Sequence, residues 1–307
     1  MKTRSGYFLI NKPTGITSND LVQKVKKKFN LDKVGHSGTL DPLASGLMVV
    51  LVNQATKVSE FFLSAKKEYE FTIKLFETTE TLDSEGPIIE KQKPFKIFKS
   101  DLNKVIKKYN GYMYQQFPPL YSAIKVDGKR LYEYARDGGR EAPNINSREV
   151  SIYSLMLKSF NTETNEITLV ASCSKGTYIR SLALDIAKEL KTIGYVTYLH
   201  RTKSGAFGIE EATDLDKLKL ENIFTIYQGL ILSEYPIYEH KNLKEIYHGK
   251  SIKINAKEET IFLSNTNNEI QAIYVRVAKG IYKCKRGLWE TDKDNMTIAQ
   301  KVELHGE

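Results

Sequence analysis

The order of hydrophobic and polar positions along the chain predicts alternating strands and helices. Residues 7–10 form a short apolar run that predicts a strand. After a Pro-Gly turn, apolar residues recur at helical period, and Thr17 and Asp20 have capping-box spacing, so we expect a helix there. Residues 47–52 are an uninterrupted apolar run, which is typical of a strand buried on both faces.

The same kind of pattern continues through the next hundred and fifty or so residues. Residues 68–76 alternate aromatic or aliphatic positions with polar ones and predict a half-buried strand. Residues 100–109 predict a helix that begins at a serine cap. Further strands are predicted at 150–160, 166–173 and 195–199, with a helix carrying Ile179, Leu182, Ile186 and Leu190 before the last of them.

Two segments depart from this pattern. Residues 111–148 contain a Pro-Pro pair, several tyrosines and scattered Lys and Arg, and they predict an excursion from the core. From about residue 237 the chain consists of short β-type runs, which predict a small β-barrel-like module. A chain of 307 residues has room for both a large body and a smaller module, so we expect domains at 1–236 and 237–307.

Composition places the chain among ordinary globular proteins. Hydrophobic residues make up 41% and charged residues 27%, and no stretch has the eighteen or so consecutive apolar residues of a membrane span. The first residues lack the long apolar region of a signal peptide, so we expect a cytoplasmic protein with no membrane partner. The net charge of +9 suits an acidic partner, and nucleic acid is the commonest one, although a lysine-rich surface is more often merely solvated.

The cysteines and histidines do not have metal-ligand spacing. Cys173 and Cys284 lie more than a hundred residues apart and are interpreted as small buried or strand residues. The five histidines form no H-x-x-x-H pair. We therefore expect neither a metal nor a cofactor.

One acidic residue has an unusual setting. Asp41 lies in the segment from Gly35 to Gly46, which has three glycines, and it precedes Pro42. Glycines let a backbone approach a ligand closely, and proline restricts the preceding residue to extended conformations. The pattern fits an exposed catalytic carboxylate, but an ordinary Asp turn before proline is the commoner explanation.

Five ordered motifs favour a catalytic role for Asp41 over an ordinary turn, because they resemble the motifs of the TruB-type tRNA pseudouridine-55 synthases. In chain order they are NKPTGITS at 11–18, GHSGTLDPLASG at 35–46, KEYE at 67–70 with TETLDSEG at 79–86, PPLYSAIK at 118–125 with GKRLYEYAR at 128–136, and CSKGTYIRSL at 173–182. The resemblance covers roughly residues 7–213, and the order and spacing of the motifs agree with the family.

The resemblance implies roles for individual residues. It implies that Asp41 is the catalytic aspartate, that Tyr69 stacks on the target base, and that Arg180 pairs with the Asp41 carboxylate. It also implies that His36 helps to hold the RNA with its base extruded. Residues that line the uridine pocket are implied to be Lys12, Tyr178 and Leu199. Whether Asp41 attacks the sugar as a nucleophile or removes a proton stays open.

The resemblance also implies an architecture and a partner. The expected fold is α+β, with a mixed, largely antiparallel central sheet flanked by helices, the pseudouridine synthase fold, and a C-terminal PUA-like module. The insertion at about 111–148 is expected to clasp the T-arm of tRNA by shape and phosphate contacts, because acids dilute its positive charge. The expected enzyme is a monomer that requires no protein partner.

Several departures and alternatives remain. Asn53-Gln54 and Phe76 stand where the family usually has glycine, and the C-terminal part resembles the PUA-like module only in length, position and β character. A non-catalytic RNA-binding or tRNA-folding protein with the same shell is the main alternative. A glycosidase that releases the base is a second, although no second carboxylate has a comparable setting. A guide-RNA-dependent relative is a third, and the short N-terminus before Lys12 favours stand-alone action.

Overall fold

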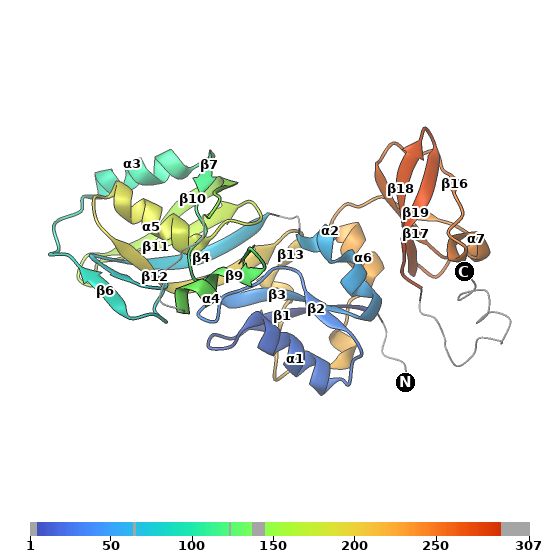
Figure 1. Ribbon diagram of the computed structural model, residues 1–307, viewed down its shortest axis with the longest axis horizontal. Helices are drawn as coiled ribbons and strands as arrows, with labels where there is room; N and C mark the ends of the chain where they lie inside the picture. Colours follow the sequence, from blue (N-terminus) through green and yellow to red (C-terminus); the bar gives the residue numbers. More distant parts are fainter. Residues whose placement is uncertain (1–4, 64–65, 123, 137–144, 290–307) are drawn as a thin grey trace.

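A ten-stranded mixed sheet forms the centre of the computed structural model, which describes residues 5–63, 66–122, 124–136 and 145–289 (Figure 1). Its strands are β1 (Gly6–Lys12), β2 (Val34–His36), β3 (Ser45–Val52), β4 (Lys67–Leu75), β7 (Tyr112–Gln116), β10 (Arg148–Asn161), β11 (Glu166–Cys173), β12 (Gly194–Ser204), β13 (Phe207–Gly208) and β14 (Thr213–Asp214). The main order is β14-β1-β3-β12-β4-β11-β10-β7. Only the β1–β14 and β3–β12 pairs are parallel among these strands, which confirms a mixed, largely antiparallel sheet.

Helices and short ribbons surround this sheet. The helices are α1 (Ser18–Lys28), α2 (Ser59–Leu63), α3 (Lys99–Tyr109), α4 (Leu131–Arg136), α5 (Ile179–Glu189), α6 (Ile226–Leu232) and α7 (Leu243–Tyr247), with 3-10 turns η1 (Asn53–Val58), η2 (Ile209–Glu211) and η3 (Leu220–Asn222). Two-stranded ribbons are formed by β5 (Glu77–Thr79) with β6 (Ile88–Lys91) and by β8 (Lys125–Val126) with β9 (Lys129–Arg130). None of the helices in the described ranges has the length and apolar composition needed to span a bilayer.

Local sequence signals explain the start of α1 but not that of α3. The capping box of α1 is present, since Thr17 accepts from the backbone of Asp20 and the Asp20 carboxylate accepts from the backbone of Thr17. In contrast, α3 begins after Phe98 without a side-chain cap, so the predicted serine cap is wrong. The buried face of α3, which includes Leu102 and Val105, packs into the core and fixes the helix instead.

The core explains why the β3 segment is apolar at every position. One face of β1 and β3 packs with α1 in the cluster that also receives β4, α3 and α5. The opposite face packs against α2 and α6 and against residues of the C-terminal sheet such as Phe262 and Ile273. Met48 and Val49 are both fully buried, one in each cluster. The predicted two-sided burial of this strand is confirmed.

The two halves of the central sheet meet at a short parallel contact. Strands β3 and β12 pair only at Ser45 with His200 and at Gly46 with Arg201. Gly46 has a φ of +106°, and a Cβ atom at this position would lie 2.4 Å from the Arg201 carbonyl oxygen. A side chain is therefore excluded both by backbone conformation and by space. The junction lies directly after the Asp41 loop in the chain, so it fixes where that loop ends.

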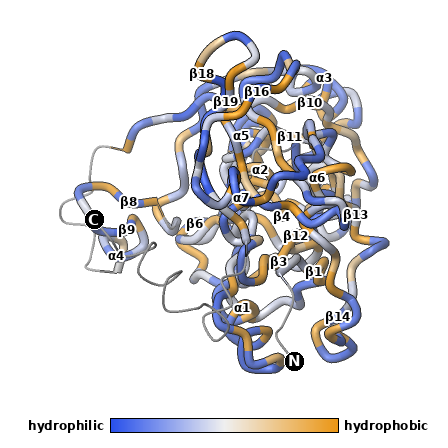
Figure 2. The backbone as a smooth tube through the Cα atoms, turned by 90° about the vertical axis from the view of Figure 1, so that its right-hand side faces the viewer, coloured by the Kyte–Doolittle hydropathy of each residue, from blue (hydrophilic) through white to orange (hydrophobic). Residues whose placement is uncertain are grey.

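The predicted insertion starts later than residue 111. Residues 112–116 are β7, which pairs with residues 148–152 of β10 and forms an edge of the central sheet. The excursion itself contains the β8–β9 ribbon and α4, which lie in front of β3 and β4 in Figure 1 and project to one side in Figure 2. Residues 137–144 of the predicted insertion lie outside the described residues.

The C-terminal β-type runs form a second sheet. Its strands are β15 (Ile237–Glu239), β16 (Ile252–Lys253), β17 (Thr260–Ser264), β18 (Ile270–Ala278) and β19 (Ile281–Gly287). The order β15-β17-β18-β19-β16 describes a curled half-barrel. Phe262, Ile273 and Leu288 join the hydrophobic cluster that covers β1 and β3, so this sheet is packed onto the body.

The junction between the half-sheets predicts a stability difference between two glycines. Gly46→Ala is expected to lower the free energy of unfolding by about 3 kcal/mol or more, because it adds a clash to the backbone strain. Gly15→Ala is the control: its φ is +79° but nothing lies within 4 Å of the added Cβ, so about 1–2 kcal/mol is expected. Urea unfolding of both variants measures the difference, and equal losses would contradict this account of the junction.

Candidate active site

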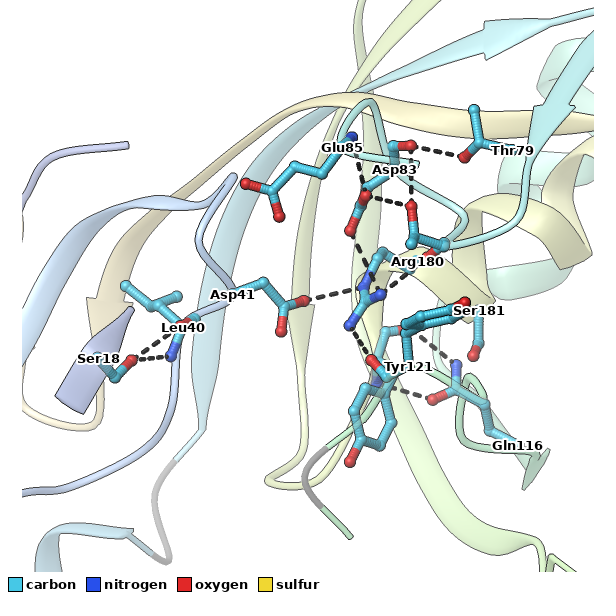
Figure 3. Close-up of polar contacts among 12 residues, drawn as sticks. Ser18, Leu40, Asp41, Thr79, Asp83, Glu85, Gln116, Tyr121, Arg180 and Ser181 are labelled. Carbon is cyan, nitrogen blue, oxygen red and sulfur yellow. Dashed lines mark hydrogen bonds and ion pairs between the residues drawn. The ribbon is translucent and has the colours of Figure 1, made fainter. Parts of the chain in front are cut away.

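Asp41 lies in the loop between β2 and β3, and neighbouring segments hold that loop in place. The hydroxyl of Ser18 donates to the Leu40 carbonyl and accepts from the Leu40 amide, both at 2.8 Å (Figure 3). The Gly15 amide donates to the Pro42 carbonyl at 2.9 Å, and the Ala44 amide donates to the Asp41 carbonyl at 3.0 Å. The residues on both sides of Asp41 are thus fixed by hydrogen bonds, which restricts where its carboxylate can point.

A second brace is provided by Lys12, whose side chain is fully buried. Its ammonium donates to the carbonyls of Ile16 at 2.7 Å, Pro13 at 2.9 Å and, at 3.4 Å, Pro42. Burial lowers the pKa of Lys12 to about 8, and nearby carboxylates including Asp41 oppose this shift. Lys12 therefore ties the turn after β1 to the Asp41 loop, and it does not reach the pocket lining described below.

Arg180, in the first turn of α5, joins the Asp41 loop to two other segments (Figure 3). Its Nε lies 2.9 Å from Asp41 Oδ2, and its Nη1 lies 3.3 Å from Asp83 Oδ2. Nη1 also donates to the Thr81 carbonyl at 2.8 Å, and Nη2 donates to the Tyr121 carbonyl at 2.9 Å. With the Arg180 side chain only 4% exposed, these contacts fix the guanidinium and hence the position of Asp41.

The two carboxylates around Arg180 differ in exposure. The Asp83 side chain is 3% exposed and also accepts from the hydroxyl of Thr81 at 2.5 Å and the amide of Glu85 at 3.1 Å. The Asp41 side chain is 31% exposed, and its contact with Nε is an ion pair in which the N–H is poorly aligned with the carboxylate. Asp83 thus anchors the arginine, while Asp41 remains accessible.

The surroundings of Asp41 act on its pKa in opposite directions. Burial raises the pKa of the Asp41 carboxyl above its ordinary value, and the negative charge of Asp83 adds to this effect. The positive charges of Arg180 and Lys12 lower the pKa but do not cancel the desolvation. Arg180 therefore preserves a carboxylate that its setting would otherwise protonate more easily.

A pocket of about 260 Å³ opens beside Asp41. Its lining includes Asp41, Tyr69, Tyr178 and Leu199, so the structure brings these four predicted residues together from four different segments of the chain. Tyr69 on β4 is 8% exposed, and Leu199 on β12 is 5% exposed. An aromatic ring and an aliphatic side chain in a pocket that also has charged side chains suit a planar, partly polar ligand.

Tyr178 is held at the pocket by neighbours on β7 and β10. Its backbone amide donates to the side chain of Gln116 at 2.8 Å, and the Gln116 amide donates to the Tyr178 carbonyl at 3.2 Å. The guanidinium of Arg148 lies 5.2 Å from the centre of the Tyr178 ring, within cation–π range. These contacts fix both the backbone and the ring of a residue next to Arg180.

His36 lies apart from this pocket. It is a half-buried residue of β2, opposite Val50 of β3, and it does not belong to the pocket lining. Its Nδ1 is buried without a hydrogen-bond partner among the described residues, and burial lowers the pKa of its imidazole. The structure of the free protein thus places His36 beside the Asp41 loop without bringing it to the target pocket.

Sequence reasoning missed the contributions of Arg201 and Lys67. Arg201 is 1% exposed, and it donates to the carbonyls of Leu47 at 2.7 Å, Gly38 at 3.2 Å and Thr39 at 3.4 Å. Lys67 is 6% exposed, and both side chains line the pocket. The available signal was their place in alternating strands, since each occupies an inward position where a hydrophobic residue is expected.

The described residues hold no group of three or more His, Cys, Asp or Glu side chains close enough to bind a metal ion. Cys173 is buried in the core, and Cys284 is half-buried in the C-terminal sheet. The site consists of one accessible carboxylate, the buried Arg180, an aromatic wall and two further buried cations, Lys67 and Arg201.

These side chains form an enzyme site in which a carboxylate lies next to a pocket that suits a planar ligand. Comparisons with known proteins identify the class of enzyme. Residues 26–179 match the model of the TruB family pseudouridylate synthase N-terminal domain. The chain is 47% identical over 284 residues to tRNA pseudouridine synthase B of Mesoplasma florum, covering 92% of this chain and 98% of that protein. The chain belongs to the TruB family of pseudouridylate synthases, which are isomerases.

Other proteins agree with this assignment. The tRNA pseudouridine synthase B of Mycoplasma mycoides subsp. mycoides is 47% identical over 285 residues, covering 92% of this chain and 97% of its own. The fold is similar to a chain in the crystal structure of a Cbf5-Nop10-Gar1 complex, with a TM-score of 0.68 at 22% identity over 94% of this chain and 86% of the other. The expected pseudouridine synthase fold is therefore confirmed.

The contacts of Arg180 with Asp41 and Asp83 predict which of the two carboxylates depends on the arginine for stability. Arg180→Met is expected to lower the free energy of unfolding by about 3–5 kcal/mol, because it leaves the Asp83 carboxylate buried without its cation. Adding Asp83→Asn to this variant should restore part of the lost stability, since the amide carries no charge. Urea unfolding measures both variants. Equal stability of the single and double variants would show that Asp83 is not the residue left uncompensated.

Proposed function

We propose that this enzyme converts the uridine at position 55 in the T-loop of tRNA to pseudouridine. The proposal rests on the ion pair between Arg180 and Asp41 at the wall of a pocket that also contains Tyr69. Membership of the TruB family supports the reaction class, and the names of the similar bacterial proteins support tRNA as the substrate.

The reaction needs few chemical groups. Pseudouridine formation breaks the bond between uracil N1 and ribose C1′, turns the base, and joins C5 to C1′, without net oxidation or reduction. After C5 has joined C1′, the C5 proton leaves and N1 takes up a proton, so the product is an isomer of the substrate. A carboxylate assists the cleavage either as a nucleophile at the sugar or as a base on a sugar proton. Asp41 is placed for such a role because its carboxylate is accessible and Arg180 fixes its position. No cofactor is needed for these steps.

The substrate must present its base outside the RNA stack. Flipping a nucleotide out requires roughly a few kcal/mol, and stacking on an aromatic ring returns about 1–3 kcal/mol. Tyr69 provides that ring in our proposal, with Tyr178 and Leu199 as further walls of the uridine pocket. Burial raises the pKa of the Tyr69 phenol, so the ring is uncharged and suited to stacking near neutral pH.

The insertion is proposed to clasp the T-arm. The Tyr121 carbonyl accepts from Arg180 and Ser122 lines the pocket, so the chain leading to the β8–β9 ribbon is tied to the site. Within the ribbon and α4, Lys129 lies over the ring of Tyr134 at 4.8 Å. This contact holds the lysine against the ring, while acids of the same segment such as Asp127 and Glu133 dilute its positive charge. Such a mixed surface favours recognition of RNA shape over simple electrostatic attraction. His36, near the base of the Asp41 loop, is proposed to contact the RNA once it is bound.

Further features of the proposal concern the working enzyme. We propose a cytoplasmic monomer that acts without a guide RNA or a protein partner. The C-terminal half-barrel is proposed to act as a PUA-like RNA-binding module, and its packing onto the body through Phe262 and Ile273 would keep it in a fixed position during binding.

The proposal predicts that Asp41→Asn removes catalysis while leaving RNA binding intact. Single-turnover formation of pseudouridine at position 55 of unmodified tRNA should fall at least about 10³-fold, because the amide is neither a nucleophile nor a base. The dissociation constant for the same tRNA should stay within about threefold. Asp216→Asn, which changes an exposed carboxylate far along the chain, is the matched control and should react like the parent protein.

The outcomes separate the competing functions. Full activity of Asp41→Asn would overturn the assigned role of Asp41. Absence of product from the parent enzyme and tRNA alone, with product only after adding a guide RNA, would exclude stand-alone action. Release of free uracil would indicate a glycosidase, and tight binding without any product would indicate a non-catalytic RNA-binding protein.

A further inference from the structure

Lys67 is a buried cation at the pocket whose role the reaction described above does not explain. It lies two residues before Tyr69 on β4, so both side chains leave the same face of the strand. Lys67 is 6% exposed and lines the same pocket as Tyr69. Its Cε lies 3.9 Å from the position of a Cβ atom built on Gly38, which places the lysine against the Asp41 loop.

The hydrogen bonds of Lys67 leave donors available. An ammonium has three N–H donors, and among the described residues Nζ makes one hydrogen bond, to the Ser204 hydroxyl at 2.8 Å. The neighbouring cation Arg201 differs, since its nitrogens donate to the Leu47, Gly38 and Thr39 carbonyls. Lys67 is therefore the member of this pair with unused donors at the pocket.

Lys67 also lacks a compensating negative charge. No carboxylate of the described residues lies within ion-pair distance of its ammonium, and burial and the charge of Arg201 lower the pKa of Lys67 to about 7. The other titratable group nearby is the Cys173 thiol on β11, whose pKa burial raises to about 11, so it stays neutral at pH 7. Tyr69 is likewise uncharged. A buried cation of this kind is stabilised when an anion enters the pocket.

The charges divide the pocket into two ends. Burial has the largest effect on the pKa of both Asp41 and Lys67, but the neighbouring charged groups differ. They are Arg180, Asp83 and Lys12 at Asp41, and Arg201 at Lys67, where Cys173 is the other titratable neighbour. Tyr69 lines the same pocket as Asp41, on the strand that carries Lys67, and the charges of both Arg201 and Asp41 act on its pKa. A uridine stacked on Tyr69 with its ribose at Asp41 would therefore place an edge of its base toward Lys67.

We propose that Lys67 is a catalytic residue that donates a hydrogen bond to a carbonyl oxygen of the target uracil and stabilises the uracil anion. This inference rests on the proposed function. When the N1–C1′ bond breaks, its electron pair stays with the base, and the negative charge spreads over N1 and the carbonyl oxygens. At the other end of the pocket, Asp41 acts on the sugar, either as a nucleophile or as a base on a sugar proton. Lys67 exchanges no electrons and keeps its proton, so its contribution is electrostatic.

The test compares Lys67→Met, Lys67→Arg and the matched control Lys66→Met in full-length enzyme. Lys66 is the adjacent exposed lysine, 5.2 Å from the Tyr153 ring. With enzyme saturating over tRNA, Lys67→Met should lower the single-turnover rate about 10²-fold, as expected for loss of one charge-stabilising donor. The tRNA dissociation constant should change less than about threefold, and Lys66→Met should have the parent rate. Lys67→Arg should recover at least about tenfold over Lys67→Met.

The pH profile gives a readout that a structural role would not move. In the parent enzyme the rate should fall as pH rises, because Lys67 loses its proton and the cation disappears. Lys67→Arg should remove this alkaline decline, since guanidinium stays charged. The opposite result would be a parent rate that falls as the pH is lowered through about 7, together with an inactive Lys67→Arg variant. That result would identify Lys67 as a base and overturn the proposal.

Two further outcomes would also overturn it. A weakened tRNA affinity with an unchanged saturating rate in Lys67→Met would place the lysine on a phosphate, and a parent-like Lys67→Met would exclude any role. Both outcomes can be observed only if the parent enzyme forms pseudouridine. A parent protein that forms none would refute the proposed function itself. Urea unfolding of each variant shows whether the fold is retained. If Lys67→Met is destabilised, the comparison of Lys67→Arg with Lys67→Met still tests the proposal.

Discussion

The site depends on the ion pairs that the buried guanidinium of Arg180 makes with Asp41 and Asp83. A charged group that is almost completely removed from water requires partners, and here they are two carboxylates and two backbone carbonyls. Because Asp83 is itself buried, it fixes the arginine from the protein side, and Asp41 faces the pocket from the other. One cation thus sets the position of the Asp41 carboxylate and limits the rise in its pKa.

The sheet gives this interaction its setting. Its two halves meet at a parallel contact of two residue pairs, where Gly46 lies directly against Arg201. Since β3 is covered on both faces by hydrophobic residues, the Asp41 loop before it ends at a firmly packed strand. Arg201 then binds three carbonyls in and after that loop, so the pocket wall is built from backbone held by charge. Charges removed from water interact more strongly with any polar ligand in the pocket.

Much of the fold was predictable because local patterns carry it. The alternation over residues 68–76 and the capping box at Thr17 depend on neighbours in the sequence, and the structure confirms both. The place of residues 112–116 was not predictable from pattern, since an edge strand is defined by pairing with residues 148–152. The site behaved similarly. Motif resemblance selected Asp41 and Arg180, but spacing alone does not bring residues 139 positions apart together, nor does it show that Lys12 turns toward backbone carbonyls.

The most direct measurement of the central claim is a structure of the Asp41→Asn enzyme bound to a T-arm stem-loop RNA. The account predicts that the target uridine is turned out of the loop, that its base stacks on Tyr69, and that its ribose C1′ or C2′ lies about 3–3.5 Å from the side chain at position 41. A target uridine still stacked within the RNA loop, or one whose ribose lies away from residue 41, would contradict the account.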